Sequence, residues 1–299
     1  MVHYKIEKLL KIPQYEQRSA EWFAQRQTKL TSSDAASVLG TSPYNKPHEL
    51  LFKKCGYDTK PFVGNVATLH GQKYEDTAIE LYCRITGREN YNFGCIAYSD
   101  VHSEFDDYNS DYNFLAGSPD GIVESLDNKD EEPILIEVKC PFRRKIKDGY
   151  IPIYYYPQVQ LNLFICNLNI ADFIEFCPKT NKLNIVRISK DMKWINKNVP
   201  ILIKFWKDVE YYREIGIEHH EEYIKKKQRD DKKELNKKLK EEKQEQQEKN
   251  KIKIQKMSNE SKASNGSKAS NGSEASNGSD EELDLVTQII NNKKCIIID

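Results

Sequence analysis

The stretch LAGSPDGIVESLDNKDEEPILIEVKCPF, residues 115–142, decides the fold. It contains two runs typical of β-strands, GIVES and PILIEVKC, and the polar segment LDNKDEE between them has the composition of a loop. We therefore expect the two runs to pair as an antiparallel hairpin. Asp120 directly precedes the first run and Glu137 lies near the end of the second, so this pairing places the two carboxylates side by side.

Side-chain alternation places Glu137 and Lys139 on one face of the second strand, opposite the apolar residues beside them. Two carboxylates at one corner of a sheet repel each other unless a cation lies between them, and Mg²⁺ fits because it prefers hard oxygen ligands. An adjacent lysine can lower the pKa of a metal-bound water and stabilise the charge that builds up when water attacks phosphorus. The pattern therefore predicts a metal-dependent hydrolytic site.

Two plainer interpretations of the same residues stay open. Pro119, Asp120 and Gly121 form a turn signal on their own, because proline fixes one torsion angle and glycine relieves the next. Glu137 and Lys139 would also suit a structural ion pair on an exposed strand face. That ion pair explains neither the turn that carries Asp120 nor the apolar residues around it, so we favour the metal site.

Helical and strand-like segments surround the hairpin. Apolar periodicity predicts helices within residues 19–40, in two pieces, and over 68–86, 154–166 and 191–256. Further strand-like runs are NFGCIAY, FLAGS, IADFIEF and LNIVRIS. A mostly β centre with helices before, between and after it predicts an α/β, more closely an α+β layered, domain.

The composition changes near residue 220. Residues 1–220 hold 28 Lys and Arg against 30 Asp and Glu, whereas residues 221–256 hold 14 basic and 9 acidic residues. Any general attraction to a polyanion would therefore come from the second segment. We divide the chain into a domain over 1–220, a long charged helical extension over 221–257, a low-complexity flexible linker over 258–282 with the repeats KASNGS, KASNGS and EASNGS, and a short apolar C-terminal segment over 283–299.

Cysteine spacing and apolar content indicate the cellular compartment. The seven cysteines lack the paired short spacings of a zinc site or a disulfide framework, so we expect reduced thiols. The N-terminal residues are too charged for a signal peptide, and no run of about 18 apolar residues exists for a membrane span. We expect an intracellular protein that is not secreted and has no membrane partner.

The motifs GSPDGIV, ILIEVKCPF and YYPQVQLNLF, in this order and at comparable spacing, resemble the phage lambda exonuclease and YqaJ-type viral recombinase nucleases of the PD-(D/E)XK superfamily. The resemblance runs from about residue 17 to about residue 210. It implies a restriction-endonuclease-like central mixed β-sheet flanked by helices. It also implies hydrolysis of DNA with Mg²⁺ or Mn²⁺, with two ions in the site.

The resemblance assigns roles at the predicted metal site. It implies that Asp120 and Glu137 bind the metal ions and that the backbone carbonyl of Val138 is a further ligand. Lys139 would act on the attacking water, and Gln158 would hold that water or the scissile phosphate. On a helix, residues two apart point in different directions, so Gln158 and its neighbour Gln160 cannot both face the metal.

Three further residues match the family upstream. Glu75 matches a helical glutamate that faces the metal site as a catalytic and metal-binding residue, and Arg26 and Ser33 match positions that grip a terminal 5′-phosphate. Each has a plainer alternative: Glu75 as a solvated helix residue, Arg26 as the partner of an acid, and Ser33 as a helix N-cap. Thr28 departs from the glycine that the family commonly has there, which puts the phosphate pocket in more doubt than the metal site.

The resemblance also implies the substrate and partners. Arg143, Arg144 and Lys145, with Lys147 beside them, would hold the DNA backbone. Degradation would start at a 5′-phosphorylated duplex end and run 5′ to 3′, giving single strands for viral recombination or repair. A homotrimer, a single-strand annealing partner and a location in the virion or the host cytoplasm or nucleus follow by analogy. The rivals are a structure- or sequence-specific endonuclease and a catalytically silent DNA-binding protein on the same fold.

Overall fold

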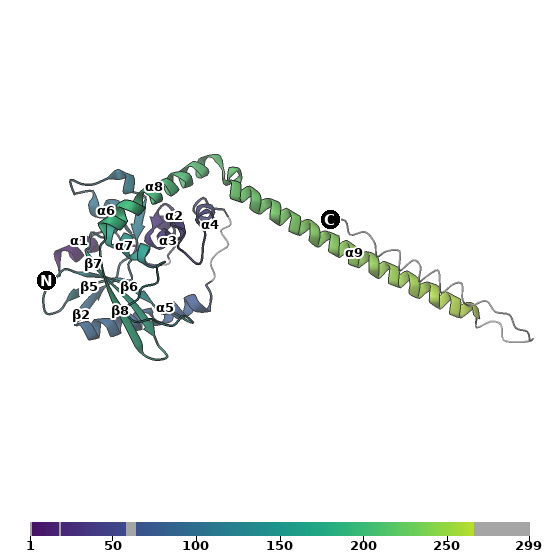
Figure 1. Ribbon diagram of the computed structural model, residues 1–299, viewed down its shortest axis with the longest axis horizontal. Coiled ribbons are helices and arrows are strands. Elements are labelled where there is room, and N and C mark those ends of the chain that lie inside the picture. The colour runs from purple at the N-terminus through teal and green to yellow at the C-terminus, as the bar shows by residue number, and fades with distance from the viewer. Residues whose placement is uncertain (1, 18, 58–63, 266–299) are drawn as a thin grey trace, which may run out of the picture. The chain divides into compact units, whose positions relative to one another are not determined.

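The computed structural model describes residues 2–17, 19–57 and 64–265. The main sheet has the strand order β2 (Arg88–Tyr91), β5 (Gly121–Ser125), β6 (Ile134–Lys139), β7 (Ile170–Cys177) and β8 (Lys182–Ser189) (Figure 1). Neighbouring strands are antiparallel except β6 and β7, which are parallel. A smaller sheet has the order β1 (Leu30–Thr31), β4 (Leu115–Gly117) and β3 (Ile96–Ala97).

Strands β5 and β6 form the predicted antiparallel hairpin. Gly121 pairs with Ile136, so Asp120, which precedes Gly121, comes next to Glu137 at the same corner of the sheet. Strand β2, which was not predicted, extends the sheet beyond β5. The strand is short and largely half-buried, and its sequence RENY shows no apolar alternation, so periodicity did not reveal it.

Helices cover both faces of the main sheet (Figure 1). Helix α5 (Val66–Thr86) packs on the face that carries Ile136 and Val138. Helix α7 (Tyr156–Ile165) connects the parallel strands β6 and β7 and packs on the opposite face, the one towards which Glu137 points. The predicted alternation along β6 is therefore confirmed, and it directs the acidic side chain into the interface between the sheet and α7.

The remaining helical elements lie before, between and after the strands. They are α1 (Tyr4–Leu10), α2 (Ala20–Gln27), η1 (Ser32–Asp34), α3 (Ala35–Val38), α4 (Pro47–Lys54), α6 (Tyr98–His102), η2 (Ser110–Tyr112), α8 (Met192–Ile215), η3 (Ile217–His219) and α9 (Glu221–Asn265). The helical pieces predicted within residues 19–40 correspond to α2 and to η1 with α3. Helix α1 was not predicted, and it buries Ile6 and Leu9 in the main core.

The helix predicted over 191–256 is interrupted. Helix α8 ends at Ile215, and Gly216 adopts φ 93° and ψ 139°, a conformation that favours glycine. A short turn of 3₁₀ helix then leads into α9. The apolar periodicity on both sides of Gly216 hid this break, because one glycine within a helical pattern is a weak stop signal.

The C-terminal extension is helical beyond its predicted end. Helix α9 continues past residue 257 to Asn265, so the first part of the predicted linker is helix. The chain divides into the compact units Met1–Lys227 and Gln228–Asp299, and the predicted apolar segment 283–299 lies outside the described residues. Ion pairs one turn apart, such as Glu234 with Lys238, stabilise the solvated helix. None of the helices described here is both long and apolar enough to cross a bilayer.

An ion pair between an arginine and a buried carboxylate joins strand β8 to the neighbouring strand β7. Asp172 is 1% exposed and accepts hydrogen bonds from Tyr82 (2.7 Å) and from two nitrogens of Arg187 (2.9 Å each). Arg187→Met is expected to lower the free energy of unfolding by about 2 kcal/mol, because the buried Asp172 carboxylate loses its cation while solvent screens the half-exposed Arg187 charge. Urea denaturation measures this loss. The matched control on β8 is Lys182→Met, whose exposed ion pair with Asp148 is expected to contribute less than about 1 kcal/mol; equal small losses in both variants would contradict the expectation.

Candidate active site

The ammonium group of Lys139 lies among the three expected metal ligands at the end of β6. Its Nζ forms an ion pair with Glu137 Oε1, donates a hydrogen bond to the carbonyl oxygen of Val138 (3.0 Å) and lies 3.5 Å from Asp120 Oδ2. The backbone N–H of Val138 donates to the same Asp120 oxygen at 2.7 Å. The structure thus brings Asp120, Glu137, Val138 and Lys139 together around one cation position.

The carboxylate of Glu137 is completely buried between the sheet and α7. Gln158 Nε2 donates to Glu137 Oε1 at 2.5 Å, and Asn162 Nδ2 donates to Oε2 at 3.2 Å. Gln160 points elsewhere: it donates to the Ser189 carbonyl and accepts from a backbone N–H near the start of α8. This geometry agrees with the choice of Gln158 over Gln160 as the residue at the metal corner. The interpretation of Glu137 and Lys139 as an ion pair on an exposed strand face does not agree with it, because Glu137 is buried.

Sequence reasoning missed Asn162. This residue lies one helical turn after Gln158, so both side chains project from the same side of α7. Its Oδ1 is buried without a hydrogen-bond partner and packs against Gly117 of β4, where any side chain would collide with it. The spacing of four residues was the signal that could have identified Asn162.

The corner holds more acidic groups than basic ones. Burial, reinforced by the charge of Asp120, raises the pKa of Glu137 to about 8, and the Lys139 ammonium opposes the rise. Burial alone would lower the pKa of Lys139, but the charges of Asp120 and Glu137 outweigh it and raise that pKa, so the ammonium stays charged at neutral pH. The Glu137 carboxyl is therefore largely protonated at neutral pH, and a divalent cation beside it would take the place of that proton.

The donor set fits a hard divalent cation. Two carboxylates and a backbone carbonyl suit Mg²⁺, which usually keeps several waters. Within residues 2–17, 19–57 and 64–265, no three His, Cys, Asp or Glu side chains gather closely enough to hold one metal ion. Helix α5, which carries Glu75, packs on the face of β6 opposite to Glu137, but the charge of Glu75 contributes to the raised pKa of Glu137. The role of Glu75 as a metal ligand stays a prediction.

Arg26 lies in a cluster of hydroxyl groups next to this corner. Its guanidinium donates to Ser118 Oγ (3.0 Å), Ser33 Oγ (3.1 Å) and Thr31 Oγ1 (3.3 Å) and packs 4.3 Å from the centre of the Trp22 ring. Ser118 stands two positions before Asp120, so the cluster and the metal corner share one segment of chain. The structure therefore brings the predicted residues Arg26 and Ser33 together and adds Ser118 and Thr31.

The plainer interpretations of Arg26 and Ser33 do not match the contacts. The Arg26 guanidinium donates hydrogen bonds to hydroxyl groups, whereas the nearby carboxylate of Asp34 forms its ion pair with Lys54 (2.9 Å). The N-cap of helix η1 is Thr31, not Ser33, and both the backbone N–H and the hydroxyl of Thr31 donate to Asp34 Oδ2 in a capping box. Neither an acid partner for Arg26 nor a capping role for Ser33 accounts for these contacts, and their binding of a 5′-phosphate stays a prediction.

Lys54 supports the Arg26 cluster from beneath. It is 6% exposed, and its Nζ donates to the carbonyl oxygens of Lys29 (2.7 Å) and Arg26 (3.1 Å) in addition to its ion pair with Asp34. Burial lowers the pKa of Lys54 despite the attraction of Asp34, whose own pKa falls because the favourable contacts with Lys54 and Thr31 outweigh burial. Lys54 is distant in sequence from both Asp34 and Arg26, so no local sequence pattern revealed this support.

The basic loop after β6 is only partly available to DNA. Arg143 and Lys145 are exposed. Arg144 differs, because it forms an ion pair with the fully buried carboxylate of Glu175, and that hydrogen bond outweighs burial and raises the pKa of Arg144. The positive charge of Arg144 is paired with Glu175 and positions the loop, and its direct contact with the DNA backbone stays a prediction.

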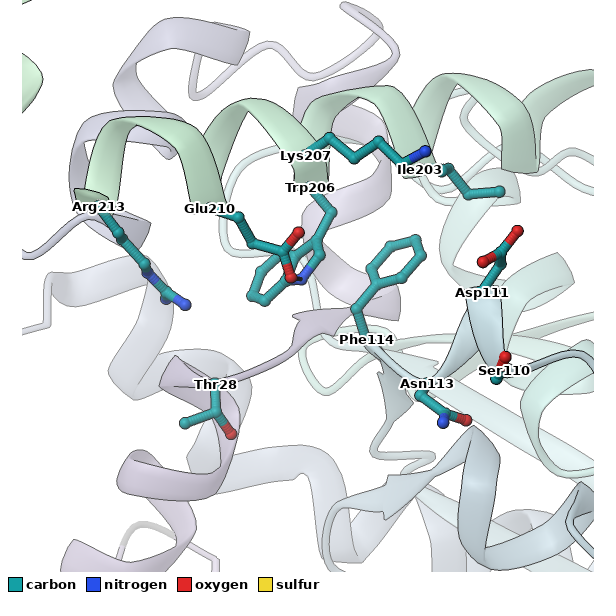
Figure 2. Close-up of a pocket in the computed structure, with 10 residues that line it drawn as sticks. All are labelled: Thr28, Ser110, Asp111, Asn113, Phe114, Ile203, Trp206, Lys207, Glu210 and Arg213. Atoms are coloured by element: carbon teal, nitrogen blue, oxygen red, sulfur yellow. Dashed lines mark hydrogen bonds between the residues drawn. The ribbon is translucent and has the colours of Figure 1, made fainter. Parts of the chain in front are cut away.

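A pocket of about 430 Å³ lies away from this corner (Figure 2). Figure 2 shows Phe114, which precedes β4, beside Trp206 of α8, and the two rings stack with centroids 5.6 Å apart. Arg213 points towards Thr28 and donates to the carbonyl oxygens of Gln27 and Lys54. The predicted metal-site residues do not line this pocket. Its contacts hold α8 against α2 and α4, the helices that support Arg26.

Comparison with known sequences finds viral relatives. The model of the YqaJ-like viral recombinase domain matches residues 21–169. An uncharacterised protein of Acanthamoeba polyphaga mimivirus is 34% identical over 181 residues, which cover 57% of this chain and 31% of that protein. A protein of African swine fever virus is 30% identical over 170 residues, which cover 50% of this chain and 46% of that protein. The match spans less than half the length of either relative.

Comparison with solved structures identifies the fold. The alkaline exonuclease LHK-Exo from Laribacter hongkongensis superimposes with a TM-score of 0.52 and 23% identity, covering 71% of this chain and 99% of that one. The crystal structure of LHK-Exo in complex with dAMP gives a TM-score of 0.53 at the same 23% identity, covering 67% of this chain and 96% of that one. The predicted mixed sheet flanked by helices is therefore confirmed.

Proposed function

Because the chain belongs, through residues 21–169, to the YqaJ-like viral recombinase family, we propose that it is a nuclease that hydrolyses the phosphodiester bonds of DNA, and in particular an exonuclease. The family and the alkaline exonuclease fold support this proposal. The observation that carries it is the position of Lys139 Nζ among Asp120, Glu137 and the Val138 carbonyl. An intact acid, acid and lysine set counts against a catalytically silent protein.

The side chains of Asp120 and Glu137 and the carbonyl of Val138 would hold Mg²⁺ or Mn²⁺, two ions by analogy with the family. A divalent cation there would supply charge to polarise the scissile phosphate and to lower the pKa of the attacking water. The chain's own residues supply the rest. Lys139 stabilises the negative charge that develops on the phosphate, and Gln158 orients the water or a phosphate oxygen. Asn162 keeps Glu137 in position.

The Arg26 cluster supports action at DNA ends. A guanidinium that, among the described residues, donates its hydrogen bonds to hydroxyls suits a terminal phosphate, because charge-assisted hydrogen bonds to phosphate are among the stronger ones. A bound 5′-phosphate would lie near Ser118, only two positions from Asp120. The chain would therefore degrade one strand of a duplex from its 5′ end.

DNA contacts and partners are part of the proposal. Arg143, Lys145 and Lys147 are exposed on the loop after β6 and would hold the DNA backbone by charge. A homotrimer, a single-strand annealing partner and an intracellular role in viral recombination or repair are proposed by analogy with the family. Because the chain spans less than half of its viral relatives, further activities of the longer proteins are not transferred to it.

The experiment that tests the proposal compares three DNA substrates in Mg²⁺. Linear duplex with 5′-phosphates is expected to be degraded to single strands and nucleotides. The same duplex with 5′-hydroxyl ends is expected to be degraded more slowly, and closed circular duplex is expected to stay intact. Rapid cutting of the circle would favour the endonuclease alternative, and no hydrolysis of any substrate would contradict a nuclease.

Arg26→Ala is expected to lower kcat/KM about 30-fold on 5′-phosphorylated duplex, because a charged hydrogen bond to a phosphate contributes about 2 kcal/mol. On duplex with 5′-hydroxyl ends the variant and the unmodified protein are expected to be similar. Initial rates on the two substrates measure the difference. Arg84→Ala, which removes an exposed arginine of α5, is the matched control; an equal loss on both kinds of end would assign Arg26 to general DNA binding or to folding.

A further inference from the structure

Three tyrosines lead outward from Lys139 to the surface, and we call them the tyrosine cluster. The Tyr155 ring lies 5.5 Å from Lys139 Nζ. Tyr154 contacts Tyr155 with ring centroids 4.5 Å apart, and Tyr44 meets Tyr154 edge to face at 5.9 Å. Tyr44 comes from the loop between α3 and α4, whereas the other two directly precede α7. Two segments far apart in sequence thus build one aromatic surface beside the candidate active site.

The two inner tyrosines are fixed by the sheet. Tyr155 packs against Phe173 of β7 with centroids 5.4 Å apart. Burial raises the pKa of both inner phenols, and the positive charge of Arg144, which forms an ion pair with Glu175, opposes the rise.

The outer tyrosine is presented to solvent. Tyr44 is 71% exposed, and Ile153, which directly precedes Tyr154 in the chain, is 69% exposed, so neither contributes much to the core. Exposed apolar groups that gather beside a site are typical of binding surfaces. The loop after β6, which also carries Arg144, adds the exposed cations Arg143 and Lys145. An aromatic surface combined with positive charge is complementary to the bases and phosphates of a nucleic-acid strand.

We propose that Tyr44 stacks on an unpaired nucleobase of the DNA strand whose phosphate enters the candidate active site. The inference rests on the proposed function and names a contact to the bases, which the metal corner and the Arg26 cluster lack. Stacking suits a nuclease without sequence preference, because every base has a π face. The face of a base is covered by its neighbours within a duplex, so a stacked end nucleotide favours fraying and leads a single strand towards Lys139.

The test uses the full-length chain carrying Lys139→Met, so that the DNA stays intact. The probe is a 5′-phosphorylated duplex with the fluorescent base analogue 2-aminopurine near the 5′ end. Binding is expected to quench the fluorescence of the analogue. Adding Tyr44→Ala is expected to remove most of the quenching and to weaken binding about tenfold. Tyr44→Phe, which keeps the ring, is expected to preserve both signals.

Tyr4→Ala is the matched control, because Tyr4 is 62% exposed on α1 and lies outside the tyrosine cluster. Unchanged quenching and affinity with Tyr44→Ala would overturn the inference and leave the surface to a protein partner. The proposed function is judged separately, by hydrolysis of the 5′-phosphorylated duplex with Lys139 in place. Hydrolysis together with unchanged quenching contradicts only the stacking contact, whereas absence of both hydrolysis and DNA binding contradicts the function as well.

Discussion

Lys139→Met is expected to lower the single-turnover rate of DNA hydrolysis about 10³-fold, the upper range for loss of one group that stabilises transition-state charge. The reason is that its Nζ contacts Glu137 and the Val138 carbonyl and lies near Asp120, where a reacting phosphate would meet the sheet. The affinity for duplex DNA is expected to change little, since the backbone contacts come from other residues. Single-turnover hydrolysis and fluorescence anisotropy measure the two quantities.

Lys182→Met serves as the control for this substitution, because it removes a lysine of the same sheet from an exposed ion pair. The thermal midpoints of both variants report whether the fold is intact. A Lys139→Met protein that is folded, binds DNA and cleaves it at an undiminished rate would show that the lysine has only a structural role.

Glu137→Gln is the second substitution with a large expected effect. It preserves the size of the side chain but removes the charge that a divalent cation needs, so hydrolysis is expected to fall at least about 10³-fold. The free energy of unfolding is expected not to decrease, because burial of this carboxylate is unfavourable, as its raised pKa of about 8 indicates.

Loss of activity with retained stability is the combination that separates a functional carboxylate from a structural one. Urea denaturation and hydrolysis rates are measured on the same preparation. Glu124→Gln is the control, because Glu124 is also a buried carboxylate, 1% exposed, on the neighbouring strand β5, and it pairs with Lys129. A Glu137→Gln protein that is destabilised yet active would contradict the assignment.

Local rules predicted the centre of the site. Alternation along one strand and the end-to-end geometry of one hairpin were enough to place Asp120, Glu137 and Lys139 together, because both depend on fixed backbone geometry. The opposite orientation of Gln158 and Gln160 followed from helical spacing alone. The identity of the family came from the resemblance and not from these rules.

Tertiary packing determines the contacts of the site that sequence patterns did not predict. The expectation for Glu75 came from the family resemblance, and the sheet face on which its helix packs cannot be read from the periodicity of the helix itself. The hydrogen bond from Lys54 to the Arg26 carbonyl joins two helices. Ser118, which accepts a hydrogen bond from Arg26, lies in the loop between β4 and β5, where no repeating pattern exists. Such contacts depend on how elements assemble.

Binding of Mn²⁺ to the full chain, measured by isothermal titration calorimetry, tests most directly whether the end of β6 is a divalent-metal site. The unmodified protein is expected to bind Mn²⁺. Lys139→Met is expected to bind it at least as tightly, because the ammonium that lies among the expected ligands is gone. Asp120→Asn and Glu137→Gln are expected to weaken binding strongly. Mn²⁺ affinity that is the same in the unmodified protein and in both carboxylate variants would contradict the account.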